Sequence, residues 1–415
     1  MARIALIGPA WPYRGGIAHF QASVARALAA RGHEVSAVTF SRQYPEALFP
    51  GTTQYEDGPP SPDLPVAPRL VDSIDPRSWF RAARHVADAG AEVAVLQVWM
   101  PFMGPAFGVI ARRLRKRGIR VVAVVHNAIP HERRPGDRAL SHYGLSACDG
   151  LIVLSDQVRE DLATLGITAP IRQRAHPAYD TFGDPTPKAD ARARLGLPAD
   201  VPVFLFFGFI RRYKGLHVLL DAWAGVRRRV PEAVLVVAGE FYADEATLRA
   251  QIDALEGVRL DADYIPDDQV GLYVSAADAV VQPYVTATQS GVAQIAFHFE
   301  RPVITTDVGG LAEIVPDGEA GLVVPPEDPA ALAAALVRFV DEGLGEKLKE
   351  GVRRARQSTS WTALAEAVER YPGVFDGVSV PSSSKAFKRA LPELIGELEA
   401  RRAGADERVT IAGDL

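Results

Sequence analysis

The stretch Val203-Phe-Leu-Phe-Phe-Gly-Phe-Ile-Arg-Arg-Tyr-Lys-Gly-Leu216 places a continuously apolar run directly before two arginines, a lysine and a helix start. An apolar run without alternation predicts a strand that is covered by helices on both faces, as in a parallel sheet. The loop after it combines the cations Arg211 and Lys214 with the free backbone N–H groups of a helix start, which favours binding of a diphosphate. A basic loop that merely closes a strand is the competing interpretation of this segment.

The same succession of apolar run, loop and amphipathic helix repeats along the whole chain. The expected strands are residues 3–7, 34–40, 92–99, 120–127 and 151–155 in the first half, and residues 203–210, 233–239, 258–265, 279–284, 302–306 and 321–324 in the second. Strands that alternate with helices predict parallel sheets. The expected fold class is therefore α/β, with two doubly wound Rossmann-like domains.

The length of 415 residues suits two or three domains. We expect a first domain at 1–182, a linker region rich in Pro, Ala, Asp and Arg at 183–202 with a short helix over 189–195, a second domain at 203–360, a helix at 361–371 and an extension at 372–415. Within the extension, residues 386–402 carry apolar side chains at helical spacing. Packing of that helix on its own protein is the default expectation, and binding of a partner is the alternative.

The composition is that of an ordinary soluble globular protein, with 48% hydrophobic and 23% charged residues. A net charge of −5 argues against nucleic acid as a partner. Cys148 is the single cysteine, so an intramolecular disulfide and a cysteine-based metal site are excluded. The start lacks a signal-peptide pattern and no apolar run reaches membrane-spanning length, so we expect a cytoplasmic protein.

Glycine pairs mark further strand exits. Gly15 and Gly16 follow the first expected strand, and Ile17, Phe20, Val24 and Leu28 then recur at helical spacing. Absent side chains at a helix N-terminus let a ligand approach the backbone, although a flexible turn is the simpler interpretation of this loop alone. The loop does not match G-x-G-x-x-G, which counts against a nicotinamide cofactor.

Two more loops of this kind lie in the second half. The segment Thr286-Ala-Thr-Gln-Ser-Gly-Val-Ala-Gln294 places Ser290 and Gly291 at an expected helix start, and Gly309-Gly310 follows the strand at 302–306 with Glu313 close behind. Open α/β sheets bind ligands at the carboxyl ends of their strands, where these loops lie. No P-loop is present, because Lys214 precedes its glycine.

Together these motifs resemble those of the family-four retaining glycosyltransferases of GT-B architecture, also called group 1 glycosyltransferases. The resemblance covers residues 3 to about 371 and is most specific over 203–324. Its motifs are Gly-Gly-Ile at 15–17, a histidine at a strand exit (His126), Arg211-x-x-Lys-Gly215 and Gly309-Gly-Leu-Ala-Glu313.

The resemblance implies transfer of a sugar from a nucleotide-diphosphate sugar to a glycan, lipid-linked or small-molecule acceptor, in a cleft between the two domains. Arg211 and Lys214 would stabilise the leaving diphosphate, because fixed cations act most strongly where water is excluded. The other residues that it assigns to donor binding are Gly15, Gly16, Gly239, Glu240, Thr288, Gln289, Ser290, Gly291, Val292 and Glu313.

His126 follows an apolar run and would face the donor sugar in this family. The family's front-side attack favours a hydrogen bond from this histidine to a sugar hydroxyl over proton abstraction. The pair His131-Glu132 would orient His126 or contact the acceptor. The competing interpretation is that His126 satisfies loop backbone next to Asn127.

One departure from the family concerns its two glutamates, spaced E-x7-E. Aligned on Gly291, their positions hold Thr288 and Ala296; aligned on Pro302, they hold Ala287 and Ile295. Both carboxylates are therefore absent. Gln289 and Gln294 can hydrogen-bond hydroxyl groups without charge, but they cannot act as a nucleophile. A weak or noncatalytic protein stays open as an alternative.

No metal is expected, since the cations take the charge role and Asp261-Ala-Asp263 lies within an expected strand, where surface-facing carboxylates are favoured. Residues 111–120, at the end of a helix expected to begin near Phe107, carry six Arg or Lys, and Arg133, Arg134 and Arg138 follow. This basic surface predicts either a peripheral contact with the inner membrane face or, as the favoured interpretation, a solvated helix end.

Three classes of function remain: a retaining glycosyltransferase, which we favour; a noncatalytic nucleotide-sugar-binding protein; and a nucleotide-sugar epimerase or phosphorolytic enzyme on the same architecture. The donor base and sugar, the acceptor and the linkage have no signature in the sequence, because the recognised motifs address only the diphosphate.

Overall fold

The computed structural model describes residues 1–45, 49, 53–56, 66–130, 134–357 and 359–370. Met1–Val368 form one compact unit. The predictions for the pair His131-Glu132, for Arg133 of the basic surface and for the extension at 372–415 lie outside the described residues.

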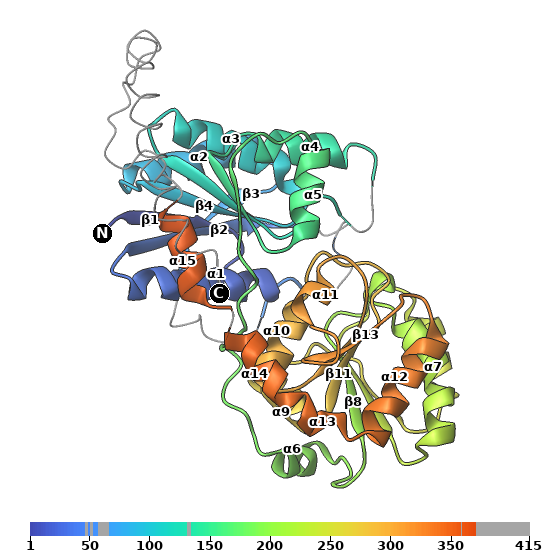
Figure 1. Cartoon of the computed structure of the whole chain (residues 1–415). Helices are drawn as coiled ribbons and strands as arrows, with labels where there is room; N and C mark the ends of the chain where they lie inside the picture. The colour runs from blue at the N-terminus through green and yellow to red at the C-terminus, as the bar shows by residue number, and fades with distance from the viewer. Residues whose placement is uncertain (46–48, 50–52, 57–65, 131–133, 358, 371–415) are drawn as a thin grey trace, which may run out of the picture. The chain divides into compact units, whose positions relative to one another are not determined.

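The compact unit contains two parallel sheets, which confirms the predicted fold class (Figure 1). The first sheet is built from β1 (Arg3–Ile7), β2 (Glu34–Arg42), β3 (Arg69–Asp72), β4 (Val93–Val98), β5 (Arg120–Val125), β6 (Gly150–Val153) and β7 (Ile171–Gln173). The second is built from β8 (Val203–Phe207), β9 (Val234–Ala238), β10 (Val258–Asp261), β11 (Ala279–Gln282), β12 (Val303–Thr306) and β13 (Gly321–Val324).

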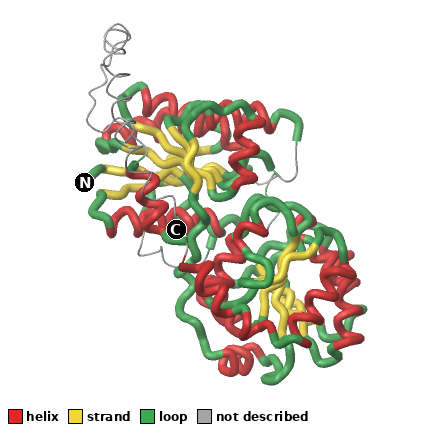
Figure 2. The backbone as a smooth tube through the Cα atoms, in the orientation of Figure 1, coloured by secondary structure: helices red, strands yellow, loops and turns green. Residues whose placement is uncertain are grey.

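Helices alternate with these strands and flank both sheets (Figure 2). Those that accompany the first sheet are α1 (Gly16–Ala30), α2 (Pro76–Asp88), η2 (Pro101–Met103), α3 (Gly104–Arg115), α4 (Asp137–Leu145) and α5 (Asp156–Thr164). The later ones are α6 (Lys188–Leu195), η3 (Arg212–Lys214), α7 (Leu216–Arg229), α8 (Glu245–Asp253), α9 (Asp267–Ala276), α10 (Gly291–His298), α11 (Leu311–Ile314), α12 (Pro329–Asp341), α13 (Leu344–Lys347), α14 (Lys349–Gln357) and α15 (Trp361–Glu369).

The strand orders are β3-β2-β1-β4-β5-β6-β7 and β10-β9-β8-β11-β12-β13. In both sheets the order in which successive strands are added therefore reverses beside the first strand, between β1 and β4 and between β8 and β11. In doubly wound sheets such a switch point opens a crevice at the carboxyl ends of the strands. The registers Ile7↔Leu96 and Leu96↔Ala123 bring the ends of β1, β4 and β5 to the same edge.

The sequence predicts eleven of these strands, and two short edge strands, β3 and β7, were not expected. Their residues are mostly half-buried, so they lack the continuous apolar run that identifies the central strands. Several predicted strands also extend too far. The run at 203–210 ends as a strand at Phe207, because Gly208 has a left-handed φ of 92°, and the buried Ile210 packs in the core from the loop that follows. The basic helix α3 begins at Gly104 rather than near Phe107.

Side-chain caps define several helix starts. Asp75 accepts a hydrogen bond from the N–H of Arg77 at the start of α2, and Ser155 and Asp328 cap α5 and α12 in the same way. Each cap satisfies a backbone donor that has no partner within the helix. Among the described residues, no helix is both long and apolar enough to cross a membrane.

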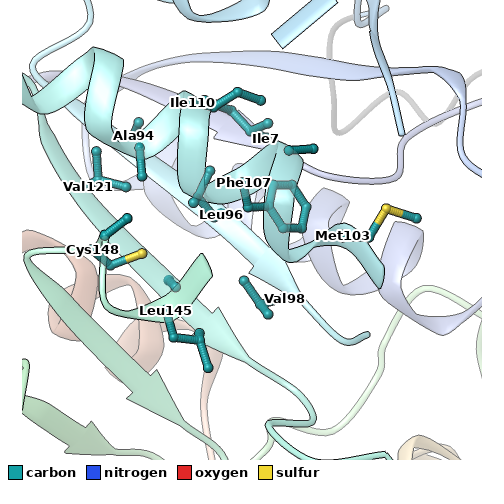
Figure 3. Close-up of a cluster of buried hydrophobic side chains, with 14 of the residues drawn as sticks. Ile7, Ala94, Leu96, Val98, Met103, Phe107, Ile110, Val121, Leu145 and Cys148 are labelled. Carbon is teal, nitrogen blue, oxygen red and sulfur yellow. The ribbon is translucent and has the colours of Figure 1, made fainter. Parts of the chain in front are cut away.

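The core of the first sheet lies between its strands and the helices α2 and α3 (Figure 3). Phe107 and Ile110 of α3 pack against the fully buried Leu96 of β4. Cys148 lies in the same cluster, and burial raises the pKa of its thiol to about 12. The thiol is therefore a packing group and not a nucleophile.

Candidate active site

The predicted phosphate loop leaves the sheet at the end of β8. Its helical turn η3 ends at Gly215, whose φ of 69° is left-handed, and α7 starts directly after it. A Cβ on Gly215 would overlap the carbonyl oxygen of Pro283, and one on Gly239 would overlap that of Gly208. Glycine at these two positions lets the exits of β8, β9 and β11 approach one another closely.

Lys214 is a buried cation in this loop, 8% exposed. Burial, with a smaller contribution from the positive charge of Arg211, lowers the pKa of its ammonium to about 7. No carboxylate among the described residues pairs with either side chain; Arg211 lies over the ring of Tyr242 at 4.9 Å and the Lys214 ammonium lies 5.8 Å from the ring centre of Tyr284. Two uncompensated cations in a partly buried loop favour binding of an anion.

The helix start predicted at Ser290 and Gly291 is confirmed, because α10 begins at Gly291 with Ser290 as its N-cap. The Ser290 hydroxyl accepts a hydrogen bond from the N–H of Ala293 at 3.2 Å and another from the side-chain amide of Gln282 at 2.9 Å. The backbone of Val292 lies in this first turn, where N–H groups have no partner within the helix. An anion at this turn would meet both the free amides and the helix dipole.

His126 lies directly after β5 and is 2% exposed. Its Nε2 is 3.0 Å from Oε1 of Gln97, and its Nδ1 is 3.3 Å from the side-chain amide nitrogen of Gln289. A carboxamide oxygen only accepts, so Nε2 carries the proton and Nδ1 accepts from Gln289. Burial lowers the pKa of His126 to about 3, with a smaller effect from His176. The imidazole is therefore neutral and its lone pair is occupied.

Thr288 joins the same network. Its hydroxyl hydrogen-bonds the side-chain oxygen of Asn127 and lies 3.4 Å from the carbonyl oxygen of His126. The structure thus brings together three of the predicted residues, Thr288, Gln289 and His126. Ala296 and Ile295, at the alternative glutamate positions, are buried apolar residues of α10.

Gly15 and Gly16 form the start of α1 as predicted, with Gly15 as N-cap at a φ of 109°. A Cβ on Gly15 would lie 4.0 Å from the ring of Phe209, which belongs to the loop after β8. The carbonyl of Gly16 accepts a hydrogen bond from the Tyr179 hydroxyl at 3.0 Å. The glycine pair therefore lies beside the phosphate loop.

Two predicted donor-binding glutamates already have protein partners. Glu240, after β9, forms a buried ion pair with Arg14. Glu313 of α11 accepts from the N–H of Asp156, at the start of α5, at 3.2 and 3.3 Å. Of the carboxylates expected to face the surface, Asp263 is exposed; Asp261 is half-buried, and its carboxylate pairs with Arg259 and accepts from the Tyr273 hydroxyl at 2.8 Å.

Sequence reasoning missed Gln97, Gln21 and Arg14. Gln97 and Gln21 are 0% exposed, and the amide nitrogen of Gln97 and both polar atoms of Gln21 have no hydrogen-bond partner among the described residues. A Cβ on Gly8 would touch both side chains, so they lie together at the end of β1. A single polar residue inside the apolar run Val93–Val98 was the available signal for Gln97. Nothing in the sequence marked the other two.

Two protein-family models match the chain. The model described as Glycosyltransferase Family 4 covers residues 14–174, and the one described as Glycosyl transferases group 1 covers residues 201–342. The first match spans most of the first sheet and the second spans the whole of the second sheet.

Curated relatives include the D-inositol 3-phosphate glycosyltransferase of Acidothermus cellulolyticus, 27% identical over 85% of this chain and 84% of that protein. The D-inositol 3-phosphate glycosyltransferase 1 of Catenulispora acidiphila is 29% identical over 87% of this chain and 90% of that protein. Both alignments extend over most of each chain, so the similarity is not confined to one sheet.

Solved structures share the fold. A sucrose-phosphate synthase from Thermosynechococcus elongatus is similar with a TM-score of 0.71, at 23% identity over 91% of this chain and 100% of that one. Anabaena HepE in complex with UDP-glucose has a TM-score of 0.70, at 16% identity over 90% of this chain and 100% of that one. The lipopolysaccharide glycosyltransferase WaaG has a TM-score of 0.65, at 18% identity over 89% of this chain and 100% of that one.

Proposed function

Because the chain belongs to the group 1 and family 4 glycosyltransferases of GT-B architecture, we propose that it transfers a sugar from a nucleotide-diphosphate sugar to an acceptor with retention of the anomeric configuration. The observation that carries this proposal is the pair Arg211 and Lys214, cations without a described carboxylate partner beside the start of α7. A diphosphate supplies the missing negative charge.

In the proposed reaction the bond from the anomeric carbon to the diphosphate oxygen breaks, and its electron pair stays on the diphosphate. Lys214, Arg211 and the first-turn amides of α10 stabilise that developing charge, which is the step where fixed cations contribute most. The acceptor hydroxyl attacks the same face of the sugar and gives its proton to the departing phosphate oxygen. No metal is needed for this charge balance.

His126 has a binding role in this proposal. Its depressed pKa and its occupied Nδ1 make it a poor base, whereas its Nε2–H can be redirected from Gln97 to a sugar hydroxyl. Gln289, next to the aligned glutamate position at Thr288, offers a neutral hydrogen bond near the sugar. The missing carboxylates therefore change the strength of sugar binding more than the departure of the diphosphate.

The first test is thermal stabilisation of the purified chain by UDP, GDP, ADP and their sugars, with Arg211→Ala/Lys214→Ala as control. A shift for one nucleotide that the double variant loses supports the donor site. Transfer is then measured with the matching sugar nucleotide and analysed by NMR for retention at the anomeric carbon. No shift from a folded protein overturns the proposal.

The acceptor screen begins with D-inositol 3-phosphate, because curated relatives over most of the chain carry it in their names. Glycan and lipid-linked acceptors form the rest of the screen. Nucleoside diphosphate released only with an acceptor marks transfer, whereas sugar isomerisation without release marks an epimerase. Incorporation of inorganic phosphate marks a phosphorolytic enzyme, and binding without turnover marks a noncatalytic protein.

We also propose a cytoplasmic location with contact to the inner membrane face through α2 and α3. Phe80 is 43% exposed, and the guanidinium of Arg113 lies 4.4 Å over its ring, with the exposed Arg81 close in the sequence. An aromatic side chain among arginines suits an anionic lipid surface. Arg112 and Arg115 instead donate to carbonyls of the fold and do not carry this proposal.

Sedimentation with vesicles tests the proposed membrane contact. Vesicles rich in anionic lipid should bind the chain, neutral vesicles should not, and Arg81→Glu/Arg113→Glu should abolish binding. Equal binding by this variant and the unaltered chain, or none by either, contradicts the membrane contact without affecting the transfer proposal.

A further inference from the structure

A cluster of potential metal ligands lies outside the residues assigned to the donor. His19 is in the first turns of α1, Glu56 follows Tyr55, and Asp267 is the first residue of α9. One ligand atom of each lies within 4.8 Å of the corresponding atoms of the other two. Nε2 of His19 and Oδ2 of Asp267 are 3.3 Å apart. These residues are distant in sequence, so ligand spacing gave no sign of them.

Among the described residues, no Lys or Arg forms an ion pair with the two carboxylates of this cluster. Burial raises the pKa of the Glu56 carboxyl, the negative charge of Asp267 raises it further, and His19 lowers it. Arg14 lies 4.4 Å over the ring of Tyr264, but its guanidinium is paired with Glu240. Two carboxylates thus share one imidazole, an arrangement that a divalent cation relieves.

The ligands are also oriented. The Tyr264 hydroxyl donates to Oδ1 of Asp267 at 3.3 Å, which leaves Oδ2 directed at His19. The ring of Phe182 packs edge-on against that of His19 with centroids 5.1 Å apart. Hydrogen bonds and packing of this kind fix the ligands of metal sites.

We propose that His19, Glu56 and Asp267 bind one divalent transition-metal ion, with Zn²⁺ as the preferred ion. One imidazole nitrogen and two carboxylate oxygens, with a fourth position left for water, is a donor set that Zn²⁺ accepts. Metal–ligand distances near 2.05 Å place tetrahedral ligand atoms about 3.4 Å apart. His19 and Asp267 already match that separation, and the widest pair, within 4.8 Å, needs to close by at most roughly 1.4 Å.

An ion at this position would join the start of α1 to the start of α9. The turn of α1 before His19 also holds Gly15 and Gly16, and Asp267 connects through Tyr264 to Arg14 and Glu240. Metal binding would therefore stiffen the backbone around the glycine pair. The site contains neither Arg211 nor Lys214, so its existence does not depend on the proposed transfer reaction.

The test uses the full chain, stripped of metal with a chelator and then titrated with Zn²⁺ by calorimetry and by metal analysis after dialysis. We expect one ion bound per chain at micromolar concentration and a rise in Tm of several degrees. Co²⁺ in place of Zn²⁺ should give the visible absorption of a four-coordinate nitrogen and oxygen site.

His19→Gln and Asp267→Asn, which retain side-chain size, should each lower the affinity at least tenfold. Asp268→Asn, at the next position of α9, is the matched control and should bind as the unaltered chain does. Absence of bound metal in the unaltered chain, or binding by His19→Gln and Asp267→Asn that equals binding by the unaltered chain, overturns the proposal. Nucleotide-induced stabilisation, measured separately, shows whether the donor site is intact in each variant.

Discussion

The two sheets have the same strand order around β1 and β8, yet the loops at their carboxyl ends carry opposite kinds of polar group. The ends of β4 and β5 hold the neutral groups of Gln97 and His126. The end of β8 leads to the cations Arg211 and Lys214. The same topology thus carries neutral hydrogen-bonding groups in one place and cations in the other, and only the side chains distinguish the two places.

Burial has opposite consequences in the two places. It makes His126 neutral, and two amide side chains then satisfy both ring nitrogens. It leaves Lys214 as a costly cation without a described counter-charge. Both ring nitrogens of His126 have partners within the protein, whereas the cation of Lys214 gains free energy from an anionic ligand.

Lys214→Met should have the largest effect, because it removes a cation from the loop after β8 and makes that loop more like the neutral region around His126. Loss of a fixed cation next to a leaving diphosphate should lower kcat of sugar transfer by about 10²–10³-fold. Stabilisation by nucleoside diphosphate should fall with it, as measured by thermal denaturation.

The exposed Lys347, which caps the carbonyl of Glu342, provides the matched control. Lys347→Met should retain the unaltered kcat. Unchanged transfer by Lys214→Met would remove Lys214 from the mechanism.

Gln97→Glu makes the converse change, because it introduces a charge into the neutral region around His126. A carboxylate 3.0 Å from Nε2 of His126 raises the pKa of the imidazole, so the ring gains a proton as the pH falls. We expect transfer to fall about 10–100-fold at low pH and to recover as the pH rises. The measurement is the pH profile of kcat together with the ¹⁵N shifts of His126.

Gln97→Leu separates charge from hydrogen bonding. It removes the acceptor without adding charge, so it should cost about 1–3 kcal/mol of stability and leave the pH profile flat. The same acid-side loss in Gln97→Leu would show that His126 does not respond to its neighbour's charge.

The pH dependence of nucleotide binding tests whether the buried ammonium of Lys214 binds the diphosphate. Its pKa in the folded, ligand-free protein is lowered from 10.5 to about 7. Between these values the unfolded chain holds more protons, so the penalty that Lys214 imposes on folding is full below pH 7 and fades as the pH rises toward 10.5. A bound diphosphate restores the charged form.

Nucleoside diphosphate affinity should therefore decrease above pH 7, by at most about tenfold per pH unit, with proton uptake on binding. Calorimetry in buffers of different ionisation enthalpy measures both. Lys214→Arg, which stays charged, should bind with little dependence on pH. An affinity that rises with pH contradicts the assigned role.

Much of this arrangement could be predicted from the sequence because continuous apolar runs and glycine-marked exits are local signals. The runs at β8 and β9 and the helix start at Gly291 are of this kind. The contacts of Gln289 with His126 and of Glu240 with Arg14 join residues more than 160 positions apart, and no local pattern encodes them. The edge strand β7 was not predicted, because its three residues are only half-buried and form no continuous apolar run.

The smallest predicted effect concerns the helix cap beside the phosphate loop. Ser290→Ala removes the N-cap of α10 and should cost about 1 kcal/mol in the free energy of unfolding. It also leaves the amide of Gln282 without its acceptor and changes the first turn where the phosphates are expected. Nucleoside diphosphate affinity should therefore weaken a few-fold, measured by calorimetry.

Asp328→Ala removes the equivalent cap from α12, where no phosphate contact is proposed. Its unfolding free energy should fall by a similar amount, while nucleotide affinity stays unchanged. A cap that only stabilises a helix lowers stability in both variants, whereas a cap that also shapes an anion site lowers affinity in one. Equal affinities in the two variants would therefore assign Ser290 to the fold, and binding of the charged ligand would then depend on the cations after β8 alone.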